Sequence, residues 1–448
     1  MITDVDFKNY RRKEDIHGTV LYPAVMVAPV QRKVLKGILN HEKIRSVFDP
    51  FHGSGTSLYE AMSLSDDISL FGCDINPLAN LITKVKLQGT SHNVSENINK
   101  LKIFIRKNES KKERYTFPNS EKWFRDDIAI SLTLVRNAIR SISCLQDRLY
   151  FWLVFSDIVR KFSNTRSSTY KLHCKDEKKI NDMVNNVIPE FLKSIEKNVG
   201  MFDKKSTNFY LYKSDIMQKI KDFKDKSFDI TITSPPYGDN ATTIPYGQFS
   251  MLSLYWIDNA DLETEGWEFE SYSKIDSKSM GGCETKIRIS NADYKLIKYY
   301  LDKIDKKKTK KVLRFFSSYF SFLREMCRVT KKYVIMTLGN RTVDGININL
   351  TTITEQYLNK HDFHIVNKYK RAIYNKRTPQ KTSSVNNQPV SSMNEEYIII
   401  YKRNSENNII WYLNYESIAF ISCIMVKRGN HCPKGKRYKY YYERDGSL

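Results

Sequence analysis

The stretch that decides the fold of this chain reads FDPFHGSGT from Phe48 to Thr56. It follows the short apolar run Ile44–Phe48 and precedes the helix-forming run Ser57–Met62, so the order is strand, glycine turn, helix. Glycines at such a turn allow backbone N–H groups to approach a ligand closely. The pattern therefore predicts an α/β domain whose first strand ends at a site for a nucleotide-like cofactor.

A second strand is expected over Ile68–Asp74, and Pro77 then opens another helix, because proline is tolerated at the first helical position. In doubly wound folds, an acid at the end of the second strand accepts hydrogen bonds from ribose hydroxyls. Asp49 and Asp74 end successive strands, so both acids are expected to converge on the glycine turn. The alternative interpretation is an α/β fold in which these aspartates only cap helices.

Farther along the chain, a strand predicted over Phe228–Thr233 leads directly into Ser234–Tyr237, which reads SPPY. Two more runs rich in β-branched and aromatic residues, Tyr333–Leu338 and Tyr397–Tyr401, predict further strands. A plain proline-rich turn is the alternative interpretation of the SPPY loop. A chance match directly after a strand, in the same chain as a glycine cofactor turn, is uncommon.

The composition of the chain limits the kinds of partner that it can have. The chain has 448 residues and a net charge of +23, which favours a polyanionic partner, although a lysine-rich proteome is an alternative source of part of the excess. No apolar run reaches the roughly 18 residues of a membrane span, and the N-terminus lacks a secretory h-region. The 7 cysteines are scattered without a C-x-x-C pair. We therefore expect a cytoplasmic protein with reduced thiols, no membrane partner and no metal site.

With both motifs in one basic chain, the sequence resembles the amino-methylating DNA methyltransferases of bacteria and phages, of the N4-cytosine and N6-adenine type. The resemblance covers roughly residues 20–90 and 207–402. It implies an α/β, Rossmann-like S-adenosylmethionine-dependent methyltransferase fold with a helical insertion. It also implies S-adenosylmethionine as cofactor, double-stranded DNA as substrate, and a cognate restriction endonuclease acting separately on the same site.

The resemblance assigns the cofactor site residue by residue. The segment around Tyr22 would close over the methionine part, Asp74 would bind the ribose, and Asp215 would contact the adenine ring. The cofactor-binding residues implied in this way are Tyr22, Pro23, Asp49, Pro50, Phe51, Gly53, Ser54, Gly55, Thr56, Asp74 and Asp215. Segments similar to other parts of the family's domain are Tyr237–Asn240, Tyr246–Ser250, Asn340–Gly345 and Met393–Tyr397.

The SPPY loop suits chemistry at an exocyclic amino group, whose nitrogen is a poor nucleophile because its lone pair is delocalised into the ring. The Ser234 hydroxyl and the Pro235 carbonyl can hold the two amino hydrogens and pull the nitrogen towards a pyramidal geometry. Tyr237 offers a flat face for a base taken out of the duplex. The expected catalytic residues are Ser234, Pro235, Pro236 and Tyr237, with direct transfer and no covalent enzyme intermediate.

The serine form of this motif is typical of N4-cytosine enzymes, whereas aspartate or asparagine more often accompanies adenine. Methylation at cytosine C5 is disfavoured because it needs a cysteine after a proline, and the chain has no Pro-Cys pair. Three alternatives stay open: an N6-adenine enzyme, an RNA methyltransferase, and a catalytically silent nucleic-acid-binding protein.

Contacts to DNA are expected outside these motifs. A polar, basic loop carries Arg166, Ser168 and Lys171, which could bind phosphates, although a solvated helix connection is an equal alternative. The run Lys306–Lys311 is more typical of a solvated helix face. His52 is assigned no proton-transfer role.

Six segments are expected along the chain. They are 1–90, the first part of the catalytic domain with the cofactor motifs; 91–205, a helical insertion and candidate DNA contact; 206–257, the catalytic domain with the SPPY loop; 258–310, an irregular insertion and candidate target-recognition region; 311–405, the rest of the catalytic domain; and 406–448, a basic, tyrosine-rich tail.

Overall fold

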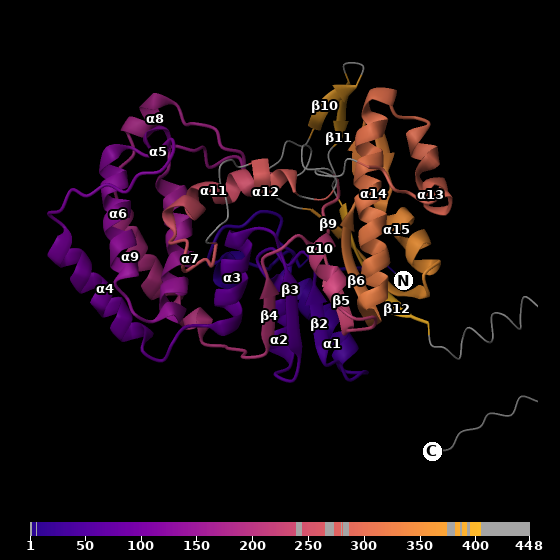
Figure 1. Ribbon diagram of the computed structural model, residues 1–448, viewed down its shortest axis with the longest axis horizontal. Helices are drawn as coiled ribbons and strands as arrows, with labels where there is room; N and C mark the ends of the chain where they lie inside the picture. The colour runs from indigo at the N-terminus through magenta and orange to yellow at the C-terminus, as the bar shows by residue number, and fades with distance from the viewer. Residues whose placement is uncertain are drawn as a thin grey trace, which may run out of the picture. The chain divides into compact units, whose positions relative to one another are not determined.

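A mostly parallel β-sheet organises the molecule (Figure 1). The computed structural model describes residues 2–5, 7–238, 244–264, 273–278, 280, 286–373, 381–385, 388–391 and 395–404. Within this part of the chain the sheet has eight strands, in the spatial order β1 (Ile2–Asp4), β9 (Phe363–Ala372), β12 (Glu395–Arg403), β6 (Thr330–Gly339), β5 (Phe228–Thr233), β2 (Ser46–Asp49), β3 (Ser69–Cys73) and β4 (Phe209–Tyr212).

The strand order reverses in the middle of the sheet. From β2 the chain adds β3 and β4 on one side, and it then returns to place β5 and β6 on the other side. These neighbours are all parallel, whereas β12 runs antiparallel between β6 and β9. In open α/β sheets, ligands bind at the carboxyl ends of the strands where the strand order reverses. In this sheet that point lies at the carboxyl ends of the neighbouring strands β2 and β5.

Side chains alternate between the two faces of the sheet, as the two-residue period of a strand requires. Ile335 and Ile398 lie in one apolar cluster with α1 (Ala28–Leu39) and α2 (Thr56–Leu64). Met336 and Ile399 lie in the cluster on the opposite face. Its helices are α10 (Ile216–Lys219), α13 (Asn291–Leu301), α14 (Lys306–Val329) and α15 (Leu350–Asn359).

A third apolar cluster belongs to a helical part that lies to one side of the sheet (Figure 1). Helix α3 (Pro77–Gln88) joins the two parts, since Leu78 and Ile82 pack into the helical cluster. The other helices here are α4 (Val94–Asn108), α5 (Ser120–Trp123), α6 (Asp126–Arg140), α7 (Leu145–Phe162), α8 (Glu177–Asn181), α9 (Val187–Asn198), α11 (Tyr246–Trp256) and α12 (Ser273–Ser277).

Short elements complete the described chain. They are the 3₁₀ turns η1 (Arg12–Glu14), η2 (Ile16–Gly18), η3 (Val199–Phe202) and η4 (Ile220–Asp222), and the hairpins β7 (Arg341–Val343) with β8 (Ile346–Ile348) and β10 (Lys381–Val385) with β11 (Gln388–Ser391). Among the described helices, none combines the length and the apolar character needed to cross a membrane.

The expected α/β class and the helical insertion are confirmed. The strands predicted around 44–48, 68–74, 228–233, 333–338 and 397–401 are β2, β3, β5, β6 and β12. The lysine run 306–311 forms the exposed first turns of α14. The segment expected to be irregular, 258–310, contains α12 and α13, and the tail 406–448 lies outside the described residues.

Candidate active site

The reversal of strand order places the two sequence motifs side by side. Val47 pairs with Ile230 and Phe48 with Thr231 in adjacent parallel strands. The turn after β2 and the loop after β5 therefore leave the same edge of the sheet. This proximity is what a reaction between a bound cofactor and a second substrate needs.

The turn after β2 depends on two glycines in the left-handed region, Gly53 with φ of 51° and Gly55 with φ of 71°. A Cβ atom at Gly55 would lie 2.6 Å from the Thr83 hydroxyl oxygen, so α3 packs against this backbone directly. The same hydroxyl donates to the Gly53 carbonyl at 3.0 Å. Helix α3 thus holds the turn in place.

Asp49, at the end of β2, is fully buried and supports the turn from below. Its carboxylate accepts a hydrogen bond from the Ser57 hydroxyl and another from the Phe51 N–H at 3.1 Å. Burial raises the pKa of Asp49 to about 6, and the Ser57 hydrogen bond opposes that shift. The neighbouring Pro50 is also buried.

Asp74 follows β3 and faces the glycine turn. One carboxylate oxygen accepts the Gly53 N–H at 3.0 Å, and the other accepts the Asn76 N–H at 2.8 Å. Burial raises the pKa of Asp74, while the nearby His52 and the two N–H donors lower it. Each carboxylate oxygen has a further lone pair, so the group can also accept from a ligand hydroxyl.

The upstream segment containing Tyr22 and Pro23 lies over the turn, and both residues are buried. The Tyr22 ring stacks on Tyr246 at 5.9 Å between centroids, and its hydroxyl accepts from the Asn76 side-chain amide at 3.2 Å. Tyr22 Cε1 lies only 3.6 Å from the position that a Cβ at Gly53 would take. This segment therefore covers one side of the turn.

These groups fit a nucleoside ligand. Gly55 is the N-cap residue of helix α2 and supplies no side-chain cap, and the buried Thr56 hydroxyl has no hydrogen-bond partner among the described residues. Ser54 is 5% exposed in the same turn. Asp215 follows β4, where one carboxylate oxygen accepts the Met217 N–H at 2.9 Å. The strands that precede Asp74 and Asp215, β3 and β4, are parallel neighbours.

The SPPY loop is tied to the sheet by its side chains. Ser234 Oγ lies 3.0 Å from the Tyr237 hydroxyl oxygen, and that hydroxyl donates to Glu396 at 3.4 Å. Arg371 donates to the other Glu396 carboxylate oxygen at 2.8 Å. Pro235 is buried and Pro236 is half-buried. Burial raises the pKa of Tyr237 well above its ordinary value.

Sequence reasoning missed Glu396 and Arg371 as members of this site. Glu396 is 159 positions from Tyr237 along the chain and reaches it because β12 lies two strands from β5. In the sequence, Glu396 stands only in a segment that resembles a later strand of the family's domain. Asp239 and Asn240 of the predicted loop extension lie outside the described residues, as do Met393 and Asn394.

The predicted DNA contacts Arg166, Ser168 and Lys171 are exposed in the loop between α7 and α8. Arg166 pairs with Asp176 at 3.2 Å. The loop packs on α11, where Tyr170 meets Phe249, which in turn meets Tyr22 at 6.0 Å.

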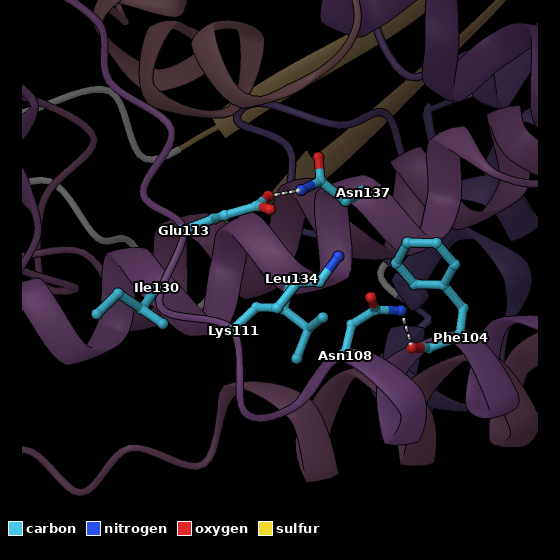
Figure 2. Close-up of a pocket in the computed structure, with 7 residues that line it drawn as sticks. All are labelled: Phe104, Asn108, Lys111, Glu113, Ile130, Leu134 and Asn137. Atoms are coloured by element: carbon cyan, nitrogen blue, oxygen red, sulfur yellow. Dashed lines mark hydrogen bonds between the residues drawn. The ribbon is translucent and has the colours of Figure 1, made fainter.

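A separate hollow lies in the helical part between α4 and α6 (Figure 2). Asn137 donates to Glu113 at 3.1 Å on its rim, and the space is about 30 Å³. That volume suits one or two water molecules and excludes a nucleotide. Within the part of the chain that the structure describes, no cluster of three or more His, Cys, Asp or Glu side chains is arranged to hold a metal ion.

Comparison with known proteins identifies the family. The type II methyltransferase M.MvaI of Kocuria varians is 31% identical to this chain over 433 residues, which are 88% of this chain and 93% of that protein. A solved structure from Pyrococcus horikoshii, described as a candidate RNA methyltransferase, aligns with a TM-score of 0.31 and 8% identity over 88% of this chain and 100% of that one. A likeness that weak carries no argument. No family model matches the chain. The chain belongs to the type II DNA methyltransferases, and its methyl donor is S-adenosylmethionine.

Proposed function

We propose that this chain methylates the N4 amino group of cytosine in double-stranded DNA, as the modification enzyme of a restriction–modification system. The observation that carries the base assignment is Ser234, a hydroxyl rather than a carboxylate or amide, directly after β5 at the edge shared with the glycine turn. A cognate endonuclease would act separately on the same site.

The cofactor would lie over the turn from Gly53 to Thr56, with Asp74 accepting from its ribose hydroxyls. Asp215 would contact the adenine ring, and Tyr22 with Pro23 would cover the methionine part. Asp49, Pro50 and Phe51 would shape the turn beneath it. S-adenosylmethionine supplies a methyl group on a positively charged sulfur when it is bound.

The cytosine amino group would be held by two acceptors. The Ser234 hydroxyl oxygen and the Pro235 carbonyl would each accept one amino hydrogen, which localises the nitrogen lone pair. Pro236 would keep the loop rigid, because proline fixes its own backbone angle, and the Tyr237 ring would stack on the flipped base. No cysteine takes part, because no covalent adduct forms.

DNA would contact the loop that carries Arg166, Ser168 and Lys171 through its phosphates. This loop supports the proposal because it is exposed and packs on α11, which also packs on Tyr22. The bases would be read from segment 91–205 or from segment 258–310.

The test is mass spectrometry of nucleosides from DNA of cells that express the protein, together with sequencing of the modified positions. N4-methylcytosine at one sequence is the expected product, and Ser234→Ala is expected to lose it while still binding the cofactor. N6-methyladenine would overturn the base assignment and keep the chemistry. 5-Methylcytosine would overturn the mechanism.

A further inference from the structure

The side chains of the SPPY loop form a hydrogen-bonded row that ends at a carboxylate on a different strand. The row runs from Ser234 to the Tyr237 hydroxyl at 3.0 Å and from there to Glu396 at 3.4 Å. Arg371, from β9, donates to the far oxygen of Glu396 at 2.8 Å. Glu396 and Arg371 are largely buried, with side-chain exposures of 20% and 15%, so water screens them little.

The chemistry of the groups fixes the direction of the row. An ionised carboxylate can only accept hydrogen bonds, so the Tyr237 hydroxyl donates to Glu396. The phenol oxygen then accepts the Ser234 hydroxyl hydrogen. The Ser234 oxygen then has only lone pairs free for a substrate, so it can accept a hydrogen bond from an amino group.

We propose that Glu396 is the terminal proton acceptor of the methyl transfer, reached from the reacting amino group through the Ser234 and Tyr237 hydroxyls. This inference rests on the proposed function, because it requires an exocyclic amino group held at Ser234. It applies to cytosine N4 and adenine N6 alike.

The step balances in atoms and charge. The amino nitrogen lone pair forms the new N–C bond, and the electron pair of the broken C–S bond stays on sulfur. One amino proton moves to Ser234 Oγ, the Ser234 proton moves to the Tyr237 oxygen, and the Tyr237 proton moves to Glu396. The positive charge of the donor and the negative charge of the carboxylate are lost together.

Tyr237 passes the proton without becoming a phenolate. Burial raises its pKa well above the ordinary value, and the neighbouring Glu396 charge raises it further. The three protons therefore shift together. Glu396 acts through its neighbours, and Arg371 is a positioning residue that keeps the carboxylate oriented.

The test compares three variants under single-turnover conditions, on DNA carrying the sequence that the wild-type enzyme modifies. Glu396→Gln keeps the shape and the acceptor for Tyr237 but cannot take up a proton, and it is expected to slow transfer by about 100-fold or more. Tyr237→Phe keeps the ring and cuts the row, so it should be slowed similarly. If Glu396→Gln fails to fold, Tyr237→Phe still decides the question.

The matched control is Glu395→Gln, the adjacent β12 residue, whose carboxylate pairs with Lys370 at 2.7 Å. It removes the same charge from the same strand and should transfer at the wild-type rate. Calorimetry with S-adenosylmethionine, and fluorescence of pyrrolocytosine replacing the target base, measure cofactor binding and base capture without turnover. Both are expected to be unchanged in Glu396→Gln, and wild-type transfer should show a curved dependence of rate on the D₂O fraction.

Four results would overturn the assignment of Glu396. They are a wild-type transfer rate in Glu396→Gln, a wild-type transfer rate in Tyr237→Phe, equal slowing by Glu395→Gln, and a loss of cofactor binding and base capture in parallel with the rate. The product of the wild-type enzyme tests the proposed function separately, since it is measured before any variant.

Discussion

The half-buried carboxylate of Asp74 holds the glycine turn and is also the proposed acceptor for the cofactor ribose. Its hydrogen bonds to the Gly53 and Asn76 amides orient it towards the turn and leave lone pairs that can accept from a ribose. Ser234 bonds to the Tyr237 hydroxyl, which donates to Glu396, so the Ser234 oxygen keeps lone pairs that can accept from a substrate. Pre-arranged polar groups of this kind do not have to reorganise when a ligand arrives.

Asp74→Ala is expected to weaken S-adenosylmethionine binding by about 1–3 kcal/mol, because the ribose hydroxyls lose a buried partner. Isothermal calorimetry measures the affinity, with Asp67→Ala as the control since Asp67 is exposed before β3. Equal affinities for the wild type and Asp74→Ala would remove Asp74 from the cofactor site.

Close packing and buried side chains join the helices around the glycine turn. Gly55 lets α3 approach the start of α2, and Lys86 reaches from α3 to donate to the Ser54 carbonyl at 2.7 Å. Lys86 also lies 3.3 Å from His17, whose other ring nitrogen is 2.9 Å from Glu60. This buried network links η2, α2 and α3 directly beneath the cofactor turn.

Two glycine-to-alanine changes are expected to have opposite signs. Gly55→Ala should destabilise the fold by about 1–2 kcal/mol from its left-handed backbone alone, and the contact with Thr83 adds to that cost. Gly37→Ala, on the exposed side of α1 with free space around its Cβ, should stabilise by about 0.5–1 kcal/mol. Denaturant unfolding measures both, and equal signs would contradict the assigned backbone geometry.

Lys86 is expected to give a measurable pH dependence of stability. Burial lowers the pKa of Lys86 to about 7, whereas the unfolded chain keeps a value near 10.4. Between these values the unfolded state binds the extra proton, so the free energy of unfolding rises with pH, by up to about 1.4 kcal/mol per unit.

Lys86→Met removes the titrating amino group. The rise in unfolding free energy between pH 7 and about pH 9 should therefore be flatter in this variant than in the wild type. The control is Lys84→Met, since Lys84 lies on the same helix as Lys86 and pairs with the exposed Glu263. Denaturant unfolding across the pH range gives the slopes. The same slope in Lys86→Met and the wild type would show that Lys86 is charged in the folded protein at neutral pH.

The molecule as a whole places the glycine turn and the SPPY loop at the carboxyl ends of adjacent strands and carries a net charge of +23. The loop with Arg166 and Lys171 lies with α11 in the helical part, to one side of the sheet (Figure 1). A duplex that meets the site would therefore exchange counterions with a basic surface.

Binding to non-cognate DNA is expected to weaken steeply with salt. Arg166→Ala and Lys171→Ala should each lower the slope of log affinity against log salt by about 1. Lys224→Ala is the control, because Lys224 is exposed just before β5, at the opposite edge of the sheet. A flat salt plot for the wild type would leave the lysine excess as a compositional bias.

Local sequence determined the elements that begin and end at strong signals. The glycine turn, Pro77 and the SPPY loop mark the ends of β2, β3 and β5, because backbone angles and missing N–H groups act within a few residues. The same signals predicted a cofactor turn and a catalytic loop. By contrast, β9 was not predicted, since Phe363–Ala372 is rich in polar residues and its burial comes from pairing with β12 and β1.

Only the tertiary structure decided which of these segments meet. The reversal of strand order puts β2 beside β5, and the antiparallel insertion of β12 brings Glu396 to a tyrosine 159 positions away. Neither contact leaves a local trace, because a strand's residue pattern fixes which side chains share a face but not which strand it pairs with. The sequence alone thus predicted the chemistry of the site, and long-range strand pairing decided that Glu396 lies within hydrogen-bonding distance of the SPPY loop.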